Sequence, residues 1–390
     1  MGNYIFIQGL YDTLDLFSDE LKIELEKIGH HTLTLRLSTM EEDLEKMLFC
    51  YRSQKIDAVI TFNNLGYNLG ESEGANLWDT MQVPYVNILM DHPFHFHEQL
   101  LHAPNQSIIC CIDRNHVDYI HRYYPNIKRV HILAHAGCAN AIEREMPRER
   151  DIDVLYAGNL SRVLIEQLIP DFESMKELDG GTFSREVLQQ LLEQPSLTTE
   201  EAIRETLQHY LPIETMQSER EYMNSFRFLD GFATSFYREM AVRILVENGI
   251  RVHVLGIGWE KCDWANHENL ILEGKVCAPE VLSYMQRSKI ILNSLTWFKA
   301  GAHDRIFNGM LSGACVISDT SSYLQEKFAD NKEPSIMLYE LENTKELPAI
   351  TKRLLNDNTL REEVASRGRI KAQQQHTWGN RLQEIFSILQ

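Results

Sequence analysis

The residue types best suited to chemistry gather in GAHDRIFNGMLSGACVISDT, residues 301–320. A glycine-containing loop leads into His303, Asp304 and Arg305 at the predicted start of a helix, and an apolar strand follows that helix. Because a helix N-terminus carries free N–H groups and a partial positive charge, it binds phosphate well, and Arg305 would add a charge-assisted contact to a diphosphate. Asn308 lies one turn further on the same face, where its amide could bind a ribose hydroxyl.

The same segment has a purely structural interpretation, in which Asp304 caps the helix and Arg305 is a surface cation. The spacing of these residues does not choose between the two interpretations.

Other polar residues follow predicted strands directly. Gly158-Asn159 is either a ligand-contacting loop or a plain turn, and Asn293 ends an apolar strand.

A third loop closes VHVLGIGW, residues 252–259, with Gly256 as the first glycine of a G-x-G pattern. That pattern after a strand is weak evidence for a nucleotide site when it stands alone. Trp259 either lines a base pocket or belongs to the core, and the sequence leaves both interpretations open.

Histidines crowd the segment MDHPFHFHEQL, which contains Asp91, His92, His95 and His97. Three interpretations compete. Asp91 or His92 is a general base for an acceptor hydroxyl, since both residue types can take a proton at neutral pH. Alternatively, the imidazoles bind a metal such as zinc or iron, or they shape a loop that a proline stiffens.

The elements that must position these residues alternate between strands and helices, which predicts parallel sheets covered on both faces. Residues 1–148 form a first domain of this kind. Its predicted strands are 4–7, 32–37, 58–62, 85–90, 107–112 and 129–133.

A second α/β domain is predicted over residues 149–375, with a helical insertion at about 162–247 and a final helix at 376–390. Thr198 and Glu201 look like a capping box inside the insertion, and Thr377 can cap the last helix. The predicted strands are 153–157, 251–255, 270–272, 290–293, 315–318 and 336–338.

Composition limits the function classes. The chain of 390 residues has a formal net charge of -18, which argues against nucleic-acid binding and against docking on an anionic membrane. No apolar run is long enough to span a membrane and no signal peptide is recognised, so we expect a cytoplasmic protein. Its seven cysteines include no C-x-x-C pair, which favours reduced thiols.

Residues 301–320 are followed by SYLQEKF, IMLYE and REEVASRGRIKAQQQHTWGNRL. Over roughly residues 250–390 this order resembles nucleotide-sugar glycosyltransferases of the GT-B fold, and more narrowly the CgeB-type glycosyltransferase-like proteins. The resemblance implies two Rossmann-like domains facing a cleft, with the donor held by the second. It also implies that the last helix crosses back to the first domain, and that donor binding needs no metal or resident cofactor.

Carried over by position, Arg305 takes the place of the family arginine and Gly158 lies in the loop that approaches the donor phosphates. Asn308 stands where the family has a glutamate that holds ribose, and Ala300 replaces a second glutamate. Together with the residues that follow the predicted strands and begin the helix, this gives the candidate donor-binding set: Gly158, Asn159, Gly256, Trp259, Asn293, His303, Asp304, Arg305 and Asn308.

The favoured function is transfer of a sugar from a nucleotide-diphosphate-sugar to a hydroxyl acceptor, with Asp91 or His92 as base. The expected partners are the donor and a glycan or protein acceptor, and a homo-oligomer is possible. Two alternatives remain open. One is a nucleotide-sugar epimerase of the same fold, and the other is an inactive glycosyltransferase-like partner protein, which the missing glutamates suggest.

Overall fold

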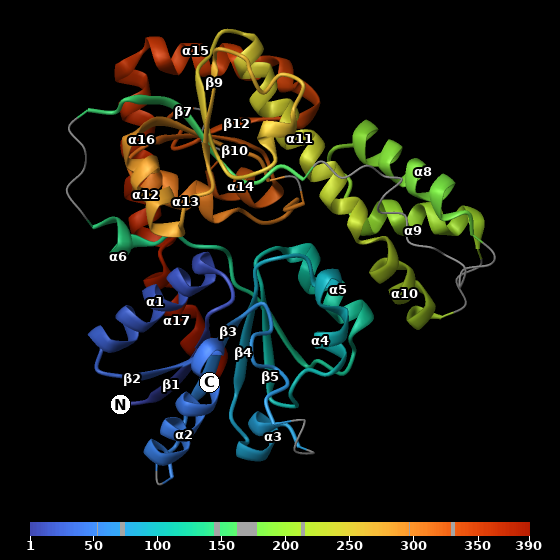
Figure 1. Ribbon diagram of the computed structural model, residues 1–390, viewed down its shortest axis with the longest axis vertical. Coiled ribbons are helices and arrows are strands. Elements are labelled where there is room, and N and C mark those ends of the chain that lie inside the picture. Colours follow the sequence, from blue (N-terminus) through green and yellow to red (C-terminus); the bar gives the residue numbers. More distant parts are fainter. Residues whose placement is uncertain are drawn as a thin grey trace. The chain divides into compact units, whose positions relative to one another are not determined.

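The computed structural model describes residues 1–52, 54–70, 75–143, 149–161, 178–211, 215–295, 297–328 and 332–390. The chain divides into two compact units (Figure 1). Unit 1 comprises Met1–Arg144, Cys277–Pro279 and Ala372–Gln390, and unit 2 comprises Glu145–Val276 and Glu280–Lys371. The domain boundary predicted near Arg148 lies outside the described residues.

Unit 1 contains a parallel sheet of six strands in the order β2-β1-β3-β4-β5-β6. The three strands β3, β4 and β5 are buried along their whole length, as expected for a parallel sheet with helices on both faces. The strands are β1 (Asn3–Gln8), β2 (His31–Arg36), β3 (Ala58–Phe62), β4 (Tyr85–Leu89), β5 (Ser107–Cys111) and β6 (Arg129–Ile132).

The helices of unit 1 include the last helix of the chain, α17, which packs beside α1 (Figure 1). They are α1 (Asp12–Lys27), α2 (Met40–Cys50), α3 (Leu77–Met81), α4 (His97–Leu101), α5 (Arg114–Tyr123), α6 (Ala139–Ile142) and α17 (Trp378–Leu389).

Helix α17 begins where the sequence predicts. Thr377 is its N-cap and forms a reciprocal capping box with Asn380, so the predicted cap is confirmed. The first turn then buries Trp378, whose ring centre lies 5.1 Å from that of Phe17 and 5.5 Å from that of Phe62. The end of the chain is therefore part of the aromatic core of unit 1.

Arg381 ties α17 to the segment after β6, and its loss should destabilise unit 1. The buried guanidinium donates to the carbonyl oxygens of Ala134, at 2.5 Å, and His135, at 3.1 Å. We expect Arg381→Met to lower the free energy of unfolding by about 2–3 kcal/mol, because buried carbonyls would lose their donors. Urea unfolding measures this, with the exposed Arg353→Met as the control. Equal losses in the two variants would contradict this role.

Unit 2 also contains six parallel strands, in the order β12-β11-β10-β7-β8-β9. The chain moves outward from β7 to β9, returns to the centre at β10 and moves outward again to β12. This is the doubly wound arrangement, with a topological switch point between β7 and β10. The strands are β7 (Ile152–Ala157), β8 (Val252–Leu255), β9 (Leu270–Gly274), β10 (Ser288–Asn293), β11 (Cys315–Asp319) and β12 (Met337–Tyr339).

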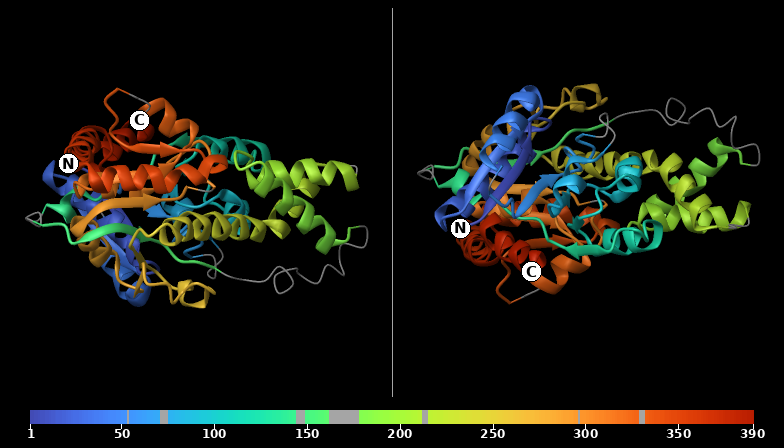
Figure 2. Two further views of the ribbon diagram at one scale, coloured as in Figure 1. Left: turned by 90° about the horizontal axis from the view of Figure 1, so that it is seen from above. Right: turned by 90° about the horizontal axis from the view of Figure 1, so that it is seen from below.

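Between β7 and β8, the described residues form helices, as the sequence predicts for the insertion. The predicted capping box of Thr198 and Glu201 is confirmed at the start of α9. Helices α8, α9 and α10 extend away from the sheet of unit 2, whereas α11 runs back toward it (Figures 1 and 2). Residues 162–177, at the start of the predicted insertion, lie outside the described residues.

The remaining helices belong to the insertion or to the rest of unit 2, and the last of them, α16, ends in unit 1. In chain order they are α8 (Gly180–Glu193), α9 (Thr199–Tyr210), α10 (Met216–Phe226), α11 (Phe228–Glu247), α12 (Ala278–Arg287), α13 (Asp304–Leu311), α14 (Ser322–Phe328), α15 (Leu347–Asn356) and α16 (Asn358–Gln375).

Every strand predicted from the sequence is present, and two Rossmann-like α/β units are confirmed. The strand ends differ from the predicted ones by no more than two residues. Within the part of the chain that the structure describes, no helix is both long and apolar enough to cross a bilayer.

Candidate functional site

The carboxyl ends of β7 and β10 meet at the switch point of unit 2, and Arg305 joins them. Its Nη1 donates to the carbonyl oxygen of Ala157, at the end of β7, at 2.6 Å. Its Nε donates to the side chain of Asn293 at 2.9 Å, and its Nη2 to the carbonyl oxygen of Ser294 at 3.2 Å. Ligands of open α/β sheets bind at this position, so Arg305 shapes the floor of the candidate site.

The guanidinium of Arg305 is buried, with only 6% of the residue exposed. Burial lowers its pKa from the ordinary value, and the positive charge of Arg238 acts in the same direction. The ring of Tyr156 lies 5.6 Å beneath the guanidinium. The alternative interpretation of Arg305 as a surface cation is therefore wrong, and its hydrogen bonds make it a residue that holds the two strand ends in place.

His303, rather than Asp304, is the N-cap of α13, which corrects the structural interpretation of this segment. The His303 Nδ1 accepts from the backbone N–H of Arg305 at 3.3 Å and also contacts the Asp304 carboxylate. The His303 ring thus lies between the first backbone N–H groups of α13 and the Asp304 side chain.

Asn308 and Asp304 lie one turn apart on α13 and are joined by a hydrogen bond. The Asn308 amide donates to the Asp304 carboxylate at 3.1 Å. The Asp304 side chain is 13% exposed, whereas Asn308 is buried. A carboxylate is therefore present beside the position at which the resemblance implies a glutamate, although a different residue supplies it.

The loops after β7 and β8 pack tightly against each other. A Cβ atom at Gly158 would lie 2.8 Å from Arg305 Nη1, and one at Gly256 would lie 2.5 Å from the Gly158 carbonyl oxygen. Gly256 also has a φ of 128°, which side-chain-bearing residues rarely adopt. Gly256 is thus required for the close approach of these two loops, whereas Gly158 leaves room for the Arg305 guanidinium.

Asn159 and Trp259 complete the contact between the same two loops. The Asn159 side chain accepts from the Ile257 N–H at 3.0 Å. Trp259 is completely buried, and its Nε1 donates to the Gly158 carbonyl oxygen at 2.8 Å. Of the two interpretations of Trp259, this burial favours the core one, with the indole supporting the loop from beneath.

Substitution of Arg305 should destabilise unit 2. Arg305→Met keeps an apolar stem but leaves the acceptors on Ala157, Asn293 and Ser294 without their donor, so we expect a loss of about 3 kcal/mol or more. Urea unfolding provides the measurement, and the exposed Arg251→Met is the matched control. A variant as stable as the wild type would show that these bonds do not hold the strand ends.

A polar pocket of about 250 Å³ lies at the carboxyl ends of β11 and β12, and the sequence analysis did not identify it. Its lining carries hydroxyl, amide, amino and carboxylate groups. Six of the lining residues are Ser196, Lys299, Thr320, Ser322, Gln325 and Glu340. Only tertiary structure brings Ser196, from the α8–α9 connection, to this sheet edge, so local patterns carry no signal for the pocket.

Arg238, on α11, is a second residue that the sequence analysis missed. Its Nη1 donates to the Asn159 carbonyl oxygen at 3.0 Å, across 79 residues of chain. Its guanidinium lies 5.1 Å from the centre of the Trp297 ring. Trp297 belongs to the loop after β10, so Arg238 contacts the loops that follow both strands of the switch point.

In unit 1, Asp91 lies at the carboxyl end of β4 in a network of amides. Its carboxylate accepts from the Asn63 side chain at 2.9 Å, and the Asn63 side-chain oxygen accepts from the Met90 N–H at 2.8 Å. Asn63 and Asn64 have φ values of 48° and 64°, and such left-handed residues gather at functional sites. Asp91 is partly exposed, so its carboxylate is held in place at the surface of this edge.

His92 is buried beneath the same edge. Its Nδ1 accepts from the Phe94 N–H at 3.2 Å, and its ring packs edge-on against His116 and Tyr119. Burial lowers the pKa of His92 to about 3 and holds that of His116 well below its ordinary value. A neutral imidazole with so low a pKa is a weak proton acceptor, which favours Asp91 as the base.

The other histidines of the loop have different environments. His97 is buried and its Nδ1 lies 3.1 Å from the Tyr124 hydroxyl, whereas His95 is exposed beside Phe94. Across the residues that the structure describes, no group of three or more histidine, cysteine, aspartate or glutamate side chains is arranged to hold a metal ion.

The buried, neutral His92 should make stability depend on pH. An unfolded histidine takes up a proton below about pH 6.5, whereas folded His92 does so only near pH 3. The free energy of unfolding should therefore fall as the pH drops through this window, by up to about 1.4 kcal/mol per pH unit for this group. We expect His92→Asn to show a shallower dependence in urea unfolding at pH 7, 6 and 5. The exposed His209→Asn should keep the wild-type slope, and an unchanged slope in His92→Asn would contradict the effect.

Comparisons with known proteins agree with this geometry. Residues 237–387 match the family model described as glycosyl transferase-like, a span that begins in α11 and ends in α17. A search of curated proteins finds no match to the chain. Among solved structures, sucrose-phosphate synthase from Thermosynechococcus elongatus is similar over 100% of this chain and 98% of its own, with a TM-score of 0.56 at 9% identity.

Two further structures show the same likeness. Anabaena HepE, solved in complex with UDP and glucose, has a TM-score of 0.52 at 11% identity and covers 100% of this chain and 99% of its own. AviGT4, a glycosyltransferase involved in avilamycin A biosynthesis, has a TM-score of 0.50 at 11% identity, with coverages of 100% and 97%. The fold is that of the GT-B glycosyltransferases. At these identities the likeness establishes the fold alone, and membership of the CgeB-type subfamily stays a prediction.

Proposed function

We propose that the protein is a glycosyltransferase that moves a sugar from a nucleotide-diphosphate-sugar to a hydroxyl acceptor. The observation that carries this proposal is the switch point of unit 2, where Arg305 fixes two strand ends beside the start of α13. The glycosyl transferase-like match covers β8 to β12 and the loops after them, all but the β7 side of this site. Anabaena HepE, a structure of the same fold, was solved with UDP and glucose.

In this proposal the nucleotide lies across the start of α13. The helix N-terminus faces the diphosphate, and the loop at Gly158 and Asn159 approaches it closely. Asp304 binds the ribose hydroxyls in place of the glutamate that the resemblance implies at position 308, and Asn308 holds its carboxylate. An amide-held carboxylate is a good acceptor for two neighbouring hydroxyls.

The sugar of the donor would occupy the pocket at the ends of β11 and β12. Its hydroxyl, amide and carboxylate lining suits a polyhydroxylated ligand, because each of these groups can pair with a sugar hydroxyl. Ser321 connects this pocket to the loop before α13, since its hydroxyl donates to the Gly301 carbonyl oxygen at 2.6 Å. The sugar and the nucleotide of the donor would thus bind to two loops that this hydrogen bond connects.

We propose that Asp91 of unit 1 is the general base, with a hydroxyl acceptor that is a glycan or a protein side chain. The acceptor oxygen attacks the anomeric carbon and gives its proton to Asp91. The bond from that carbon to the phosphate oxygen breaks, and its electron pair leaves with the diphosphate. Positive groups of unit 2 stabilise that leaving group.

The test measures binding of UDP, GDP, ADP and dTDP, and of the matching glucose derivatives. Thermal unfolding of the protein with and without each ligand reports the binding. A ligand present at 100 times its dissociation constant should stabilise the folded protein by about 2.7 kcal/mol. We expect at least one of them to do so. Asp304→Asn should weaken that ligand about tenfold, because a charged acceptor of the ribose hydroxyls is lost.

Asp263→Asn, an exposed change elsewhere in unit 2, is the control and should bind as the wild type does. Asp91→Asn should keep donor binding and lose sugar transfer. Failure of every nucleotide diphosphate to bind the wild type would overturn the proposed function.

A further inference from the structure

The helical insertion contributes a cation to the switch point of unit 2. Arg238 lies in the middle of α11 and donates from Nη1 to the Asn159 carbonyl oxygen. In the described part of the chain no carboxylate pairs with it, and its buried Nε has no hydrogen-bond partner there. By contrast Arg243, on the same helix, pairs with Glu247 at 2.7 Å.

Arg238 and Arg305 differ in what their guanidinium groups can offer a ligand. Arg305 is almost fully buried, and each of its three nitrogens already donates to the protein. Arg238 is only partly buried and uses one nitrogen in this way. Its fork of N–H groups therefore keeps donors for an anion.

The two positive charges are close enough to act on one another, and the charge of Arg238 disfavours the protonated form of Arg305. Like charges in a poorly solvated place repel, and this repulsion costs free energy that a bound anion would offset. A diphosphate carries the charge and the several acceptor oxygens that such a pair favours.

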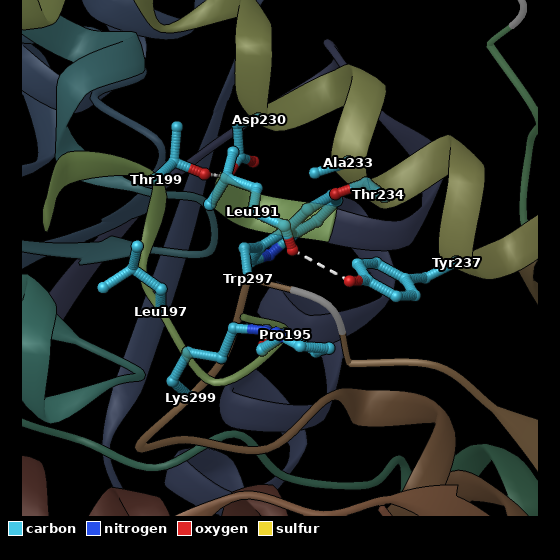
Figure 3. Close-up of a pocket in the computed structure, with 10 residues that line it drawn as sticks. All are labelled: Leu191, Pro195, Leu197, Thr199, Asp230, Ala233, Thr234, Tyr237, Trp297 and Lys299. Carbon is cyan, nitrogen blue, oxygen red and sulfur yellow. Dashed lines mark hydrogen bonds between the residues drawn. The ribbon is translucent and has the colours of Figure 1, made fainter. Parts of the chain in front are cut away.

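The loop after β10 carries the Trp297 ring on which Arg238 lies, and this loop is next to the helices of the insertion. Trp297 and Lys299 of that loop lie among side chains of α8, α11 and the start of α9 (Figure 3). The Tyr237 hydroxyl, next to Arg238 in sequence, donates to the Leu191 carbonyl oxygen at 2.8 Å, and Lys299 donates to that of Pro195. The Trp297 ring on which Arg238 lies thus borders a pocket that three helices of the insertion also line.

We propose that Arg238 is the arginine that contacts the diphosphate of the donor, and that Trp297 positions it. This inference rests on the proposed function and deepens it, because it transfers the diphosphate contact from Arg305 to a residue of the insertion. Arg305 remains beneath the site as the residue that joins β7 to β10.

The experiment compares nucleoside diphosphates with nucleosides. UDP, GDP, ADP and dTDP, and the four corresponding nucleosides, are titrated by calorimetry into the wild type, Arg238→Met, Arg238→Lys and Arg243→Met. For the diphosphate that the wild type binds, we expect Arg238→Met to weaken binding at least tenfold and to flatten its salt dependence. Binding of the corresponding nucleoside should change less than twofold.

Arg238→Lys should restore part of the lost affinity, since it keeps the charge without the planar fork. Arg243→Met, the control on the same helix, should bind as the wild type does. Trp297→Leu should weaken the diphosphate and spare the nucleoside, with a smaller effect than Arg238→Met.

Two negative results are distinguishable. If the wild type binds a diphosphate and Arg238→Met binds it equally well, Arg238 is not the contact, and the proposed function stands. If Arg238→Met weakens the nucleoside as much as the diphosphate, the residue only supports the structure, and the inference is overturned. If the wild type binds none of the diphosphates, the proposed function fails and this inference fails with it.

Discussion

One buried guanidinium group joins the two strands between which the chain of unit 2 reverses its course across the sheet. Arg305 donates to acceptors at the ends of β7 and β10. It is also the second residue of α13, so the same residue ties the start of this helix to both strands. Removing a charged group from water is costly unless its hydrogen bonds are satisfied, so the strand ends and the helix start must keep their relative positions. The loops above them depend on that constraint.

In the proposed function, the residue that holds the site, Arg305, differs from the residues that would face the donor. Gly256 lets the loop after β8 lie against the loop at Gly158, and Asp304 is partly exposed on α13. Arg238 comes from the insertion and meets both loops of the switch point. The chain carries a net charge of -18, yet the positive charges of Arg238 and Arg305 act on one another here, and in the proposed function a bound anion offsets their repulsion.

In the histidine-rich segment of unit 1, two residues that are adjacent in sequence have different environments. His92 caps a short helical turn and packs against His116 and Tyr119, so burial keeps it neutral. Asp91, its neighbour in sequence, is held at the surface by Asn63. Adjacent positions thus differ in solvation, and burial keeps His92 from taking up a proton at neutral pH.

Within the described residues, the sequence determined the local structure: the twelve strands, the helices of the insertion, and the caps at Thr198 and Thr377. These follow from periodicity and from hydrogen bonds between residues a few positions apart, so a linear pattern contains them. Only the tertiary structure decided that Arg305 is buried, that His303 replaces Asp304 as the cap, and that Arg238 meets Asn159 across 79 residues. Burial and long-range pairing depend on which strands become neighbours after the crossover connections close, and no single segment of the chain records that.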